Sequence, residues 1–363
     1  LGHRPVETME AELNSFKESR PMGLVLPSLF SELEGEALPH IIDELVKVPY
    51  LSEIVIGLDR ADREQYRIAL EFFSRLPQHH RILWNDGPRL QALDQQLQSL
   101  DLAPRELGKG RNVWYCMGYT LASGRAESLA LHDCDILTYD RALLARLIYP
   151  VAQPLLRALK KTLGDMEYLE YMDSFRYPLA GEFSFRKDVL NDILIPSDWG
   201  LEIGVLSEMC RNYANNRLCQ ADIAGVYDHK HQDLSADNDE GGLSKMSIDI
   251  AKALFRKLAS RGVTFNTESF RSLKATYYRI ALDFVETYHN DAVINGLSLD
   301  IHQEEQAVEL FAENIMKAGE AFLANPMERP FIPSWNRVIS AVPDILQQLL
   351  EAVEADHAEF AAG

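Results

Sequence analysis

Residues 128–135 read Ser-Leu-Ala-Leu-His-Asp-Cys-Asp, a short apolar segment that stops on two carboxylates one residue apart. An apolar segment of this length is typical of a buried strand whose end marks the edge of a sheet. In extended chain, alternate residues point the same way, so Asp133 and Asp135 would face one spot while Cys134 points back into the protein. Two hard oxygen ligands at a strand end suit Mg²⁺ or Mn²⁺ carrying a diphosphate. A turn or helix cap is the alternative interpretation.

A second Asp-x-Asp sequence, Asp237-Asn238-Asp239, shows that the pattern alone is weak. It lies in a polar run flanked by glycines, with no apolar strand before it. It also fails as a calcium loop, because Gly241 takes the fifth position and Ile248 takes the twelfth, where a Glu is needed. We interpret this segment as a solvated loop.

The bulk properties are those of an ordinary globular protein, with 363 residues of which 47% are hydrophobic and 25% are charged. The net charge of −19 argues against nucleic acid or anionic lipid as a main partner, since both require clustered Lys and Arg. No apolar run approaches the roughly 20 residues that span a bilayer, and the first residues contain no signal-peptide core. The cysteines form no C-x-x-C pair. We therefore expect a cytoplasmic protein with reduced thiols and no membrane span.

From residue 22 the chain alternates between strand-like and helix-like segments, which predicts a largely parallel sheet flanked by helices. Strands are expected over residues 23–29, 52–59, 80–86 and 128–135, and helices over residues 38–46, 61–76 and 108–124. Ligands of such sheets bind beyond the carboxyl ends of the strands, where Asp59 and the aspartate pair fall.

The end of the chain has a different character, because apolar stripes recur there at helical spacing, around Phe255, Phe311 and Leu349. We expect these stripes to pack against the first domain or a partner subunit. The predicted division is a helical arm over residues 1–21, an α/β domain over residues 22–240 and a helical region over residues 241–363.

Lys109, between Gly108 and Gly110, falls where the helix before the aspartate pair begins. Free backbone N–H groups and the positive end of the helix dipole favour an anion there, and the lysine adds a point charge. The alternative interpretation of the same residues is a flexible glycine-rich turn with a solvated lysine. Neither the Walker sequence nor a G-x-G-x-x-G after the first strand is present, which argues against a P-loop or dinucleotide-binding fold.

Taken in order, these segments resemble the retaining GT-A glucosyl-3-phosphoglycerate and mannosyl-3-phosphoglycerate synthases and related enzymes that form glucosylglycerate. The resemblance covers about residues 22–235. It implies an α/β fold of the GT-A type, a Rossmann-like mixed sheet flanked by helices, with a helical C-terminal region. The matching segments are Leu26–Glu32 for the P-A-L-N-E-E loop, Gly108–Trp114 for G-K-G-x-x-x-W, Asp133–Asp135 for D-A-D, Pro178–Glu182 for P-L-A-G-E and Gly200–Gly204 for G-x-E-I-G. Phe30 and Ser31 depart from the first of these motifs.

The resemblance also implies roles for individual residues. Asp133 and Glu202 would be the catalytic residues that contact the donor sugar, and Asp135 with His229 would hold the cation. His229 ends an apolar segment, and neutral imidazole is a good ligand for ions such as Mn²⁺. Arg176 and His231 are the predicted acceptor contacts. The predicted donor contacts are Pro27, Leu29, Glu32, Asp59, Lys109, Asp133, Leu179, Ala180 and Gly181.

The acceptor region departs from the family pattern. The family's phosphoglycerate enzymes carry a Gly-Gly-Arg-Val-Thr-like turn before the P-L-A-G-E segment, whereas residues 163–177 are acidic here. Phosphate recognition needs an Arg fork or a nest of N–H groups, and only Arg176 is an obvious candidate. We therefore expect glycerate, or another acceptor with at most one negative charge, to be preferred over 3-phosphoglycerate.

The sequence thus predicts a metal-dependent glycosyltransferase. It would move a hexose from a nucleoside diphosphate sugar to a small acceptor such as glycerate or 3-phosphoglycerate, with retention implied by the resemblance, and it would act as a homodimer. One alternative is a sugar-phosphate nucleotidyltransferase, which would want a Gly-rich, Arg-containing loop after the first strand; residues 27–32 contain no Gly. Another is a non-catalytic scaffold that presents the helical region to partners.

Overall fold

The computed structural model describes residues 10–11, 13–15, 17–139, 149–175, 178–214, 217–220, 242–294, 296, 299–326 and 332–361. The predicted arm over residues 1–21 is therefore only partly described. Of residues 149–154 only the backbone is described. Among the described residues, no helix is both long enough and apolar enough to cross a membrane.

A five-stranded mixed sheet forms the centre of the α/β part, in the order β3-β2-β1-β4-β5. The parallel strands are β1 (Met22–Leu29), β2 (Leu51–Asp59), β3 (His80–Trp84) and β4 (Ser128–Leu131). The edge strand β5 (Phe183–Arg186) pairs antiparallel with β4. This mixed sheet confirms the predicted GT-A fold class.

The helices of this part are η1 (Phe30–Glu34), α2 (Ala37–Leu45), α3 (Arg63–Phe73), α4 (Pro88–Ser99), α5 (Lys109–Ser123), α8 (Lys187–Asp192) and α9 (Leu201–Asn212). Successive residues of β1 enter different cores. Leu26 packs in the cluster that contains Ile41 of α2 and Tyr66 of α3, whereas Val25 packs with Trp114 of α5. Because both faces are covered, the central strands are continuous apolar runs.

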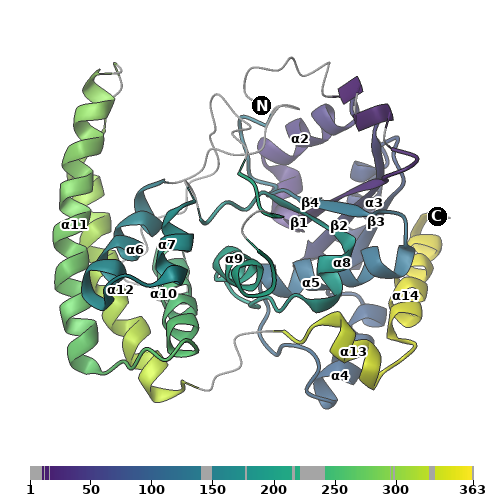
Figure 1. The fold of residues 1–363 in the computed structure, drawn as a ribbon. Helices are drawn as coiled ribbons and strands as arrows, with labels where there is room; N and C mark the ends of the chain where they lie inside the picture. The colour runs from purple at the N-terminus through teal and green to yellow at the C-terminus, as the bar shows by residue number, and fades with distance from the viewer. Residues whose placement is uncertain are drawn as a thin grey trace.

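A second body of helices lies beside the sheet, on the left in Figure 1. It contains α6 (Tyr149–Leu163), α7 (Glu167–Asp173), α10 (Gly242–Ala259), α11 (Thr267–Ile294) and α12 (Ile301–Ala324). Leu156 of α6, Met172 of α7 and Phe255 of α10 share one core in it. The apolar stripes predicted around Phe255 and Phe311 face this core.

The last two helices return to the sheet body, on the right in Figure 1: α13 (Trp335–Ala341) and α14 (Ile345–Ala361). Trp335 stacks on Trp114 of α5 with ring centroids 4.3 Å apart, and its indole donates a hydrogen bond to the Trp114 carbonyl at 3.1 Å. Arg81 of β3 donates to Glu354 of α14 at 2.9 Å. The helices after residue 241 therefore pack in two places.

Replacing Trp335 by Ala should lower the free energy of unfolding by about 3–5 kcal/mol, because a fully buried indole leaves a cavity behind it. Trp335 is 1% exposed. Urea denaturation of the variant and the parent gives the difference. Trp199→Ala is the control, since Trp199 is 37% exposed and should cost little. A loss below about 1 kcal/mol for Trp335→Ala would mean that α13 contributes little to the sheet body.

Candidate active site

The carboxyl ends of the parallel strands meet at one edge of the sheet. Leu29 of β1 lies opposite Asp59 of β2 in the strand register. Beyond the end of β4, the His132 N–H still donates to the Val25 carbonyl at 3.1 Å. The strand ends at Leu131, earlier than the predicted end at residue 135, and the loop that carries Asp133 and Asp135 leaves the sheet beside β1.

Lys109 at the start of α5 joins two carboxylates from distant parts of the chain. Its ammonium lies 2.8 Å from Oδ1 of Asp133 and donates to Oε1 of Glu202 on α9 at 2.8 Å. The lysine side chain is 18% exposed and that of Glu202 is 9% exposed, so the contact is largely shielded from water. Residues 109, 133 and 202, predicted to serve one donor, thus meet at one point.

The charges in this cluster shift one another's pKa values. Burial by itself would lower the pKa of Lys109, but Asp133 and Glu202 outweigh it and hold that pKa well above its usual range. Burial raises the pKa of Glu202, and the neighbouring ammonium opposes this. The lysine is therefore a firmly protonated cation facing two acids.

Glycines allow the surrounding backbone to approach. A Cβ on Gly181 would lie 2.2 Å from Oδ2 of Asp133, so the predicted donor segment lies directly against that carboxylate. Cβ atoms on Gly108 and Gly110 would lie 2.4 Å from the Ser197 carbonyl oxygen and 1.8 Å from that of Pro196. The Gly-Lys-Gly turn is therefore a tightly packed junction with residues 196–197, rather than a loose turn.

Adding a methyl group at Gly181 should displace Asp133 from Lys109. We expect Gly181→Ala to reduce kcat/KM about tenfold, because small misplacements of a positioning group weaken the reactive geometry. Steady-state assays with the sugar nucleotide measure this. Gly35→Ala is the control, since its Cβ would come no closer than 3.3 Å to a neighbouring atom. Equal activity of the Gly181 variant and the parent would show that Asp133 need not stay in place.

Asp135 lies among other negatively charged groups. Burial, followed by the charge of Asp133, raises the pKa of Asp135 to about 6, and Glu32 adds to this while Lys109 opposes it. Cys134 between the aspartates is buried, as the extended spacing predicts. Excess negative charge of this kind fits a hard divalent cation. Within the described residues, no three His, Cys, Asp or Glu side chains are grouped to hold a metal; His229, the second predicted ligand, lies outside them.

Asp59 is held by two amides that the sequence analysis did not select. Asn85 donates to its Oδ1 at 2.7 Å, and Asn112 of α5 donates to its Oδ2 at 3.0 Å and to the Gly57 carbonyl at 2.9 Å. Burial raises the pKa of Asp59, and the two amides oppose that shift. Asn112 follows Lys109 by three residues on one helix face, which is the signal that could have revealed it.

The remaining predicted residues fall into two groups. The described ones lie on segments around the same edge: Pro27 and Leu29 in β1, Glu32 in η1, and Leu179, Ala180 and Gly181 before β5. Arg176, His229 and His231 lie outside the described residues, as do Asp237 and Asp239.

Within the acidic stretch over residues 163–177, the described residues 167–173 form α7, which packs in the helical body. Tyr168, Leu169 and Met172 of α7 are buried in the core of the helical body. Two of its acids have basic partners on α6, because Lys160 contacts both Glu170 and Asp173 at 2.9 Å and Arg157 lies 3.8 Å from Asp173. These contacts weaken the argument that this stretch would repel a phosphate group.

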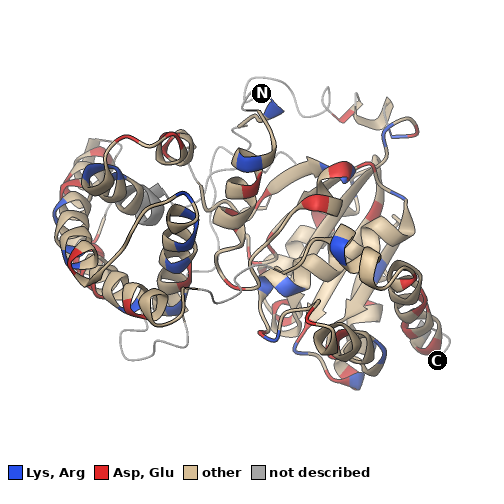
Figure 2. Ribbon diagram, turned by 60° about the horizontal axis from the view of Figure 1, so that its bottom comes forward, with Lys and Arg blue, Asp and Glu red and all other residues tan. Residues whose placement is uncertain are grey.

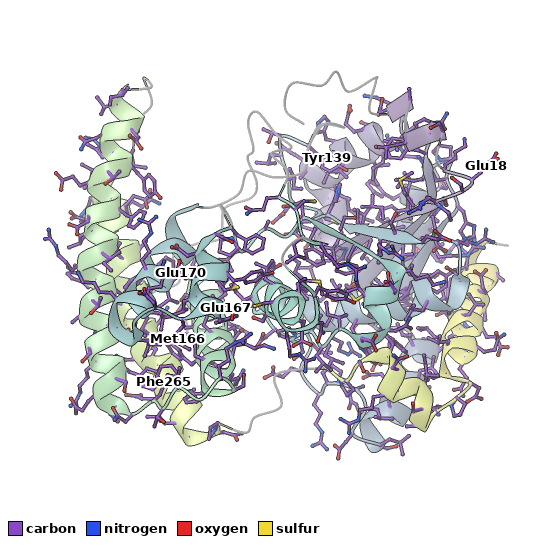
Figure 3. All side chains as sticks on the ribbon, viewed as in Figure 1. Glu18, Tyr139, Met166, Glu167, Glu170 and Phe265 are labelled. Carbon is purple, nitrogen blue, oxygen red and sulfur yellow. The ribbon has the colours of Figure 1, made fainter. Side chains whose placement is uncertain are left out.

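A separate cavity of about 340 Å³ opens beside α7 in the helical body. Figure 3 labels two of its lining residues, Glu167 and Glu170. The residues that line it are Glu167, Glu170, Tyr171, Ser174, Phe175, Leu218, Cys219 and Gln220. Because it includes neither Lys109 nor either aspartate of the pair, this cavity is not the site described above.

Comparison with known proteins points in one direction. A glucosyl-3-phosphoglycerate synthase of Persephonella marina is 40% identical, across 98% of this chain and 96% of the relative. One of Methanococcoides burtonii is 36% identical, across 98% and 95%. The glucosyl-3-phosphoglycerate synthase of Mycobacterium tuberculosis, solved with Mn²⁺, UDP and glucosyl-3-phosphoglycerate, superposes with a TM-score of 0.50 at 21% identity, covering 71% of this chain and 86% of that chain. No protein-family model matches the chain.

The mixed sheet has the GT-A fold of that solved structure, and the two relatives that match nearly the full chain show that the class is glycosyltransferase. The full-length relatives narrow this class further. The chain belongs to the glucosyl-3-phosphoglycerate synthase family.

Proposed function

We propose that this enzyme transfers glucose from UDP-glucose to the free hydroxyl group of 3-phosphoglycerate, with Mn²⁺ or Mg²⁺ as cofactor, and releases UDP. The observation that carries the proposal is the meeting of Lys109 with Asp133 and Glu202, which brings the predicted diphosphate and sugar contacts together. The relatives are named for this product, and the Mycobacterium tuberculosis enzyme has been solved with Mn²⁺, UDP-glucose and phosphoglyceric acid.

Each residue would have a distinct task. Lys109 binds the donor diphosphate through charge-assisted hydrogen bonds. Asp133 and Glu202 accept hydrogen bonds from the sugar hydroxyls and fix the sugar for attack. Asp135 and His229 would hold the cation, which when bound stabilises negative charge on the leaving diphosphate. Pro27, Leu29, Glu32, Asp59 and the 179–181 segment complete the proposed donor site.

The acceptor proposal revises the expectation that glycerate is preferred. That expectation rested on an acidic stretch over residues 163–177, but Lys160 offsets Glu170 and Asp173 there. The full-length relatives are synthases of the phosphorylated product. We keep Arg176 as the proposed phosphate contact and His231 as a second acceptor contact.

A donor and acceptor screen tests the proposal. Thermal stabilisation by UDP-, GDP- and ADP-glucose, each with Mn²⁺, should be largest for UDP-glucose. Turnover with that donor should then be faster for 3-phosphoglycerate than for glycerate, and Arg176→Ala should remove the difference. Faster turnover with glycerate in the parent enzyme would restore the original expectation.

We further propose a cytoplasmic enzyme that forms a homodimer. All four cysteines are free thiols, as expected for a reducing compartment. In Figure 2, acidic and basic residues alternate along the helices, so this view shows no basic face suited to nucleic acid. Light scattering on a sizing column would test the dimer by giving the molar mass in solution.

A further inference from the structure

The groups assigned to different parts of the donor contact one another in this structure. Lys109, assigned to the diphosphate, donates to Asp133 at 3.0 Å and to Glu202 at 2.8 Å, the two carboxylates assigned to the sugar. The three side chains are 18%, 28% and 9% exposed, so water screens these contacts only weakly. The Lys109 ammonium is therefore placed to act as a counterion for both carboxylates.

We propose that Lys109 has a second role as an internal counterion, which keeps a divalent cation out of the site until the donor diphosphate arrives. This inference rests on the function proposed above. The Lys109 ammonium contacts the Asp133 carboxylate. Its positive charge also acts on Asp135, the proposed cation ligand. The positive charge of Lys109 repels a divalent cation, because water screens the charges in this site only weakly.

Arrival of the diphosphate exchanges the partners. Phosphate oxygens offer the ammonium equally strong charge-assisted hydrogen bonds. Its flexible four-carbon stem allows Lys109 to turn toward them. Asp133 and Glu202 then lose the ammonium as a hydrogen-bond donor. Their carboxylates accept hydrogen bonds from the sugar hydroxyls instead. At the same time the positive charge beside Asp135 moves onto the diphosphate, and the cation can enter with its ligand.

The surrounding backbone confines this exchange to the lysine side chain. Gly181 lies against the Asp133 carboxylate, and Gly108 and Gly110 lie against the carbonyls of Ser197 and Pro196. These close contacts hold the backbone on both sides of the ion pair. Lys109 thereby makes the site select the complex of cation and diphosphate over the free cation.

Binding of Mn²⁺ to nucleotide-free protein, followed by electron paramagnetic resonance, tests the inference without any turnover. Lys109→Met should bind Mn²⁺ at least about fivefold more tightly than the parent, the lower end of typical coupling between linked sites. The same variant should bind UDP more weakly in calorimetry without metal. Lys109→Gln keeps a hydrogen-bond donor and should show the same gain, whereas Lys109→Arg keeps the charge and should match the parent.

Lys257→Met is the matched control, because Lys257 lies 2.8 Å from Glu208 of α9 with a side chain 12% exposed. It removes a similar buried pair elsewhere and should leave Mn²⁺ binding unchanged. Mn²⁺ binding to Lys109→Gln or Lys109→Met no tighter than to the parent would overturn the inference, as would an equal gain in Lys109→Arg. If that happens while the parent still forms product, the proposed function stands without the counterion role.

Discussion

Asp135→Ala should reduce turnover about a thousandfold, an effect of about 4 kcal/mol on the activation barrier, while the fold stays intact. Asp135 is the described ligand of the proposed cation site, where burial and the charges of Asp133 and Glu32 raise its pKa. Without it the cation loses a principal ligand, and the leaving diphosphate keeps an uncompensated charge. The variant should also lose the stabilisation that Mn²⁺ gives to UDP binding.

The second Asp-x-Asp sequence supplies the control for this experiment. Asp239→Ala should keep activity, because no apolar run directly precedes this pair in the sequence. Circular dichroism of both variants would establish that each is folded. If Asp239→Ala lost activity while Asp135→Ala kept it, the cation would belong to the other sequence.

Glu202→Gln should lower kcat/KM with UDP-glucose by about 10²–10³-fold, the range seen when a preorganised electrostatic contact is removed. The amide keeps the size of the side chain but removes the charge that, by our proposal, orients the sugar. Because Glu202 contacts no part of UDP in this account, and its charge competes with the diphosphate for Lys109, UDP alone should bind at least as well as to the parent.

Glu208→Gln on the same helix is the matched control, since Glu208 is 1% exposed and contacts Lys257 rather than Lys109. Its kcat/KM should stay near that of the parent. A Glu202→Gln variant that loses UDP and UDP-glucose affinity equally would place Glu202 at the nucleotide and not at the sugar.

Local patterns in the sequence predicted much of the α/β part. The strand before Asp133 is mostly apolar and is followed by polar residues, and the helix that begins at Lys109 is capped by Gly124, where φ is +63°. These features depend on residues close together in the chain, so spacing reveals them. The same holds for the meeting of strand ends at one sheet edge, since parallel pairing requires it.

Contacts between segments that are distant in the chain could not be predicted from the sequence. Nothing near Trp335 indicates that it stacks on Trp114, because that pairing depends on the path of the chain between them. The sequence alone predicts a repulsive surface for the acidic stretch over residues 163–177. It does not reveal that Lys160, one helix earlier on α6, contacts Glu170 and Asp173. Asn85 and Asn112 were missed for a similar reason, as their shared partner Asp59 comes from another strand.

Family membership also bears on the two rival interpretations. Identity of 40% and 36% over almost the whole chain links it to glycosyltransferases, not to nucleotidyltransferases. The same full-length relatives are enzymes, which argues against a scaffold without catalytic function. The chain is an enzyme of the glycosyltransferase class.

The most direct test of the central claim is nuclear magnetic resonance of the products formed from UDP-glucose, 3-phosphoglycerate and Mn²⁺. We expect glucosyl-3-phosphoglycerate and UDP in equal amounts, with the small anomeric coupling of an α-glucoside, as retention requires. Release of glucose without transfer, or an unchanged mixture when UDP-, GDP- and ADP-glucose are each supplied, would contradict the account.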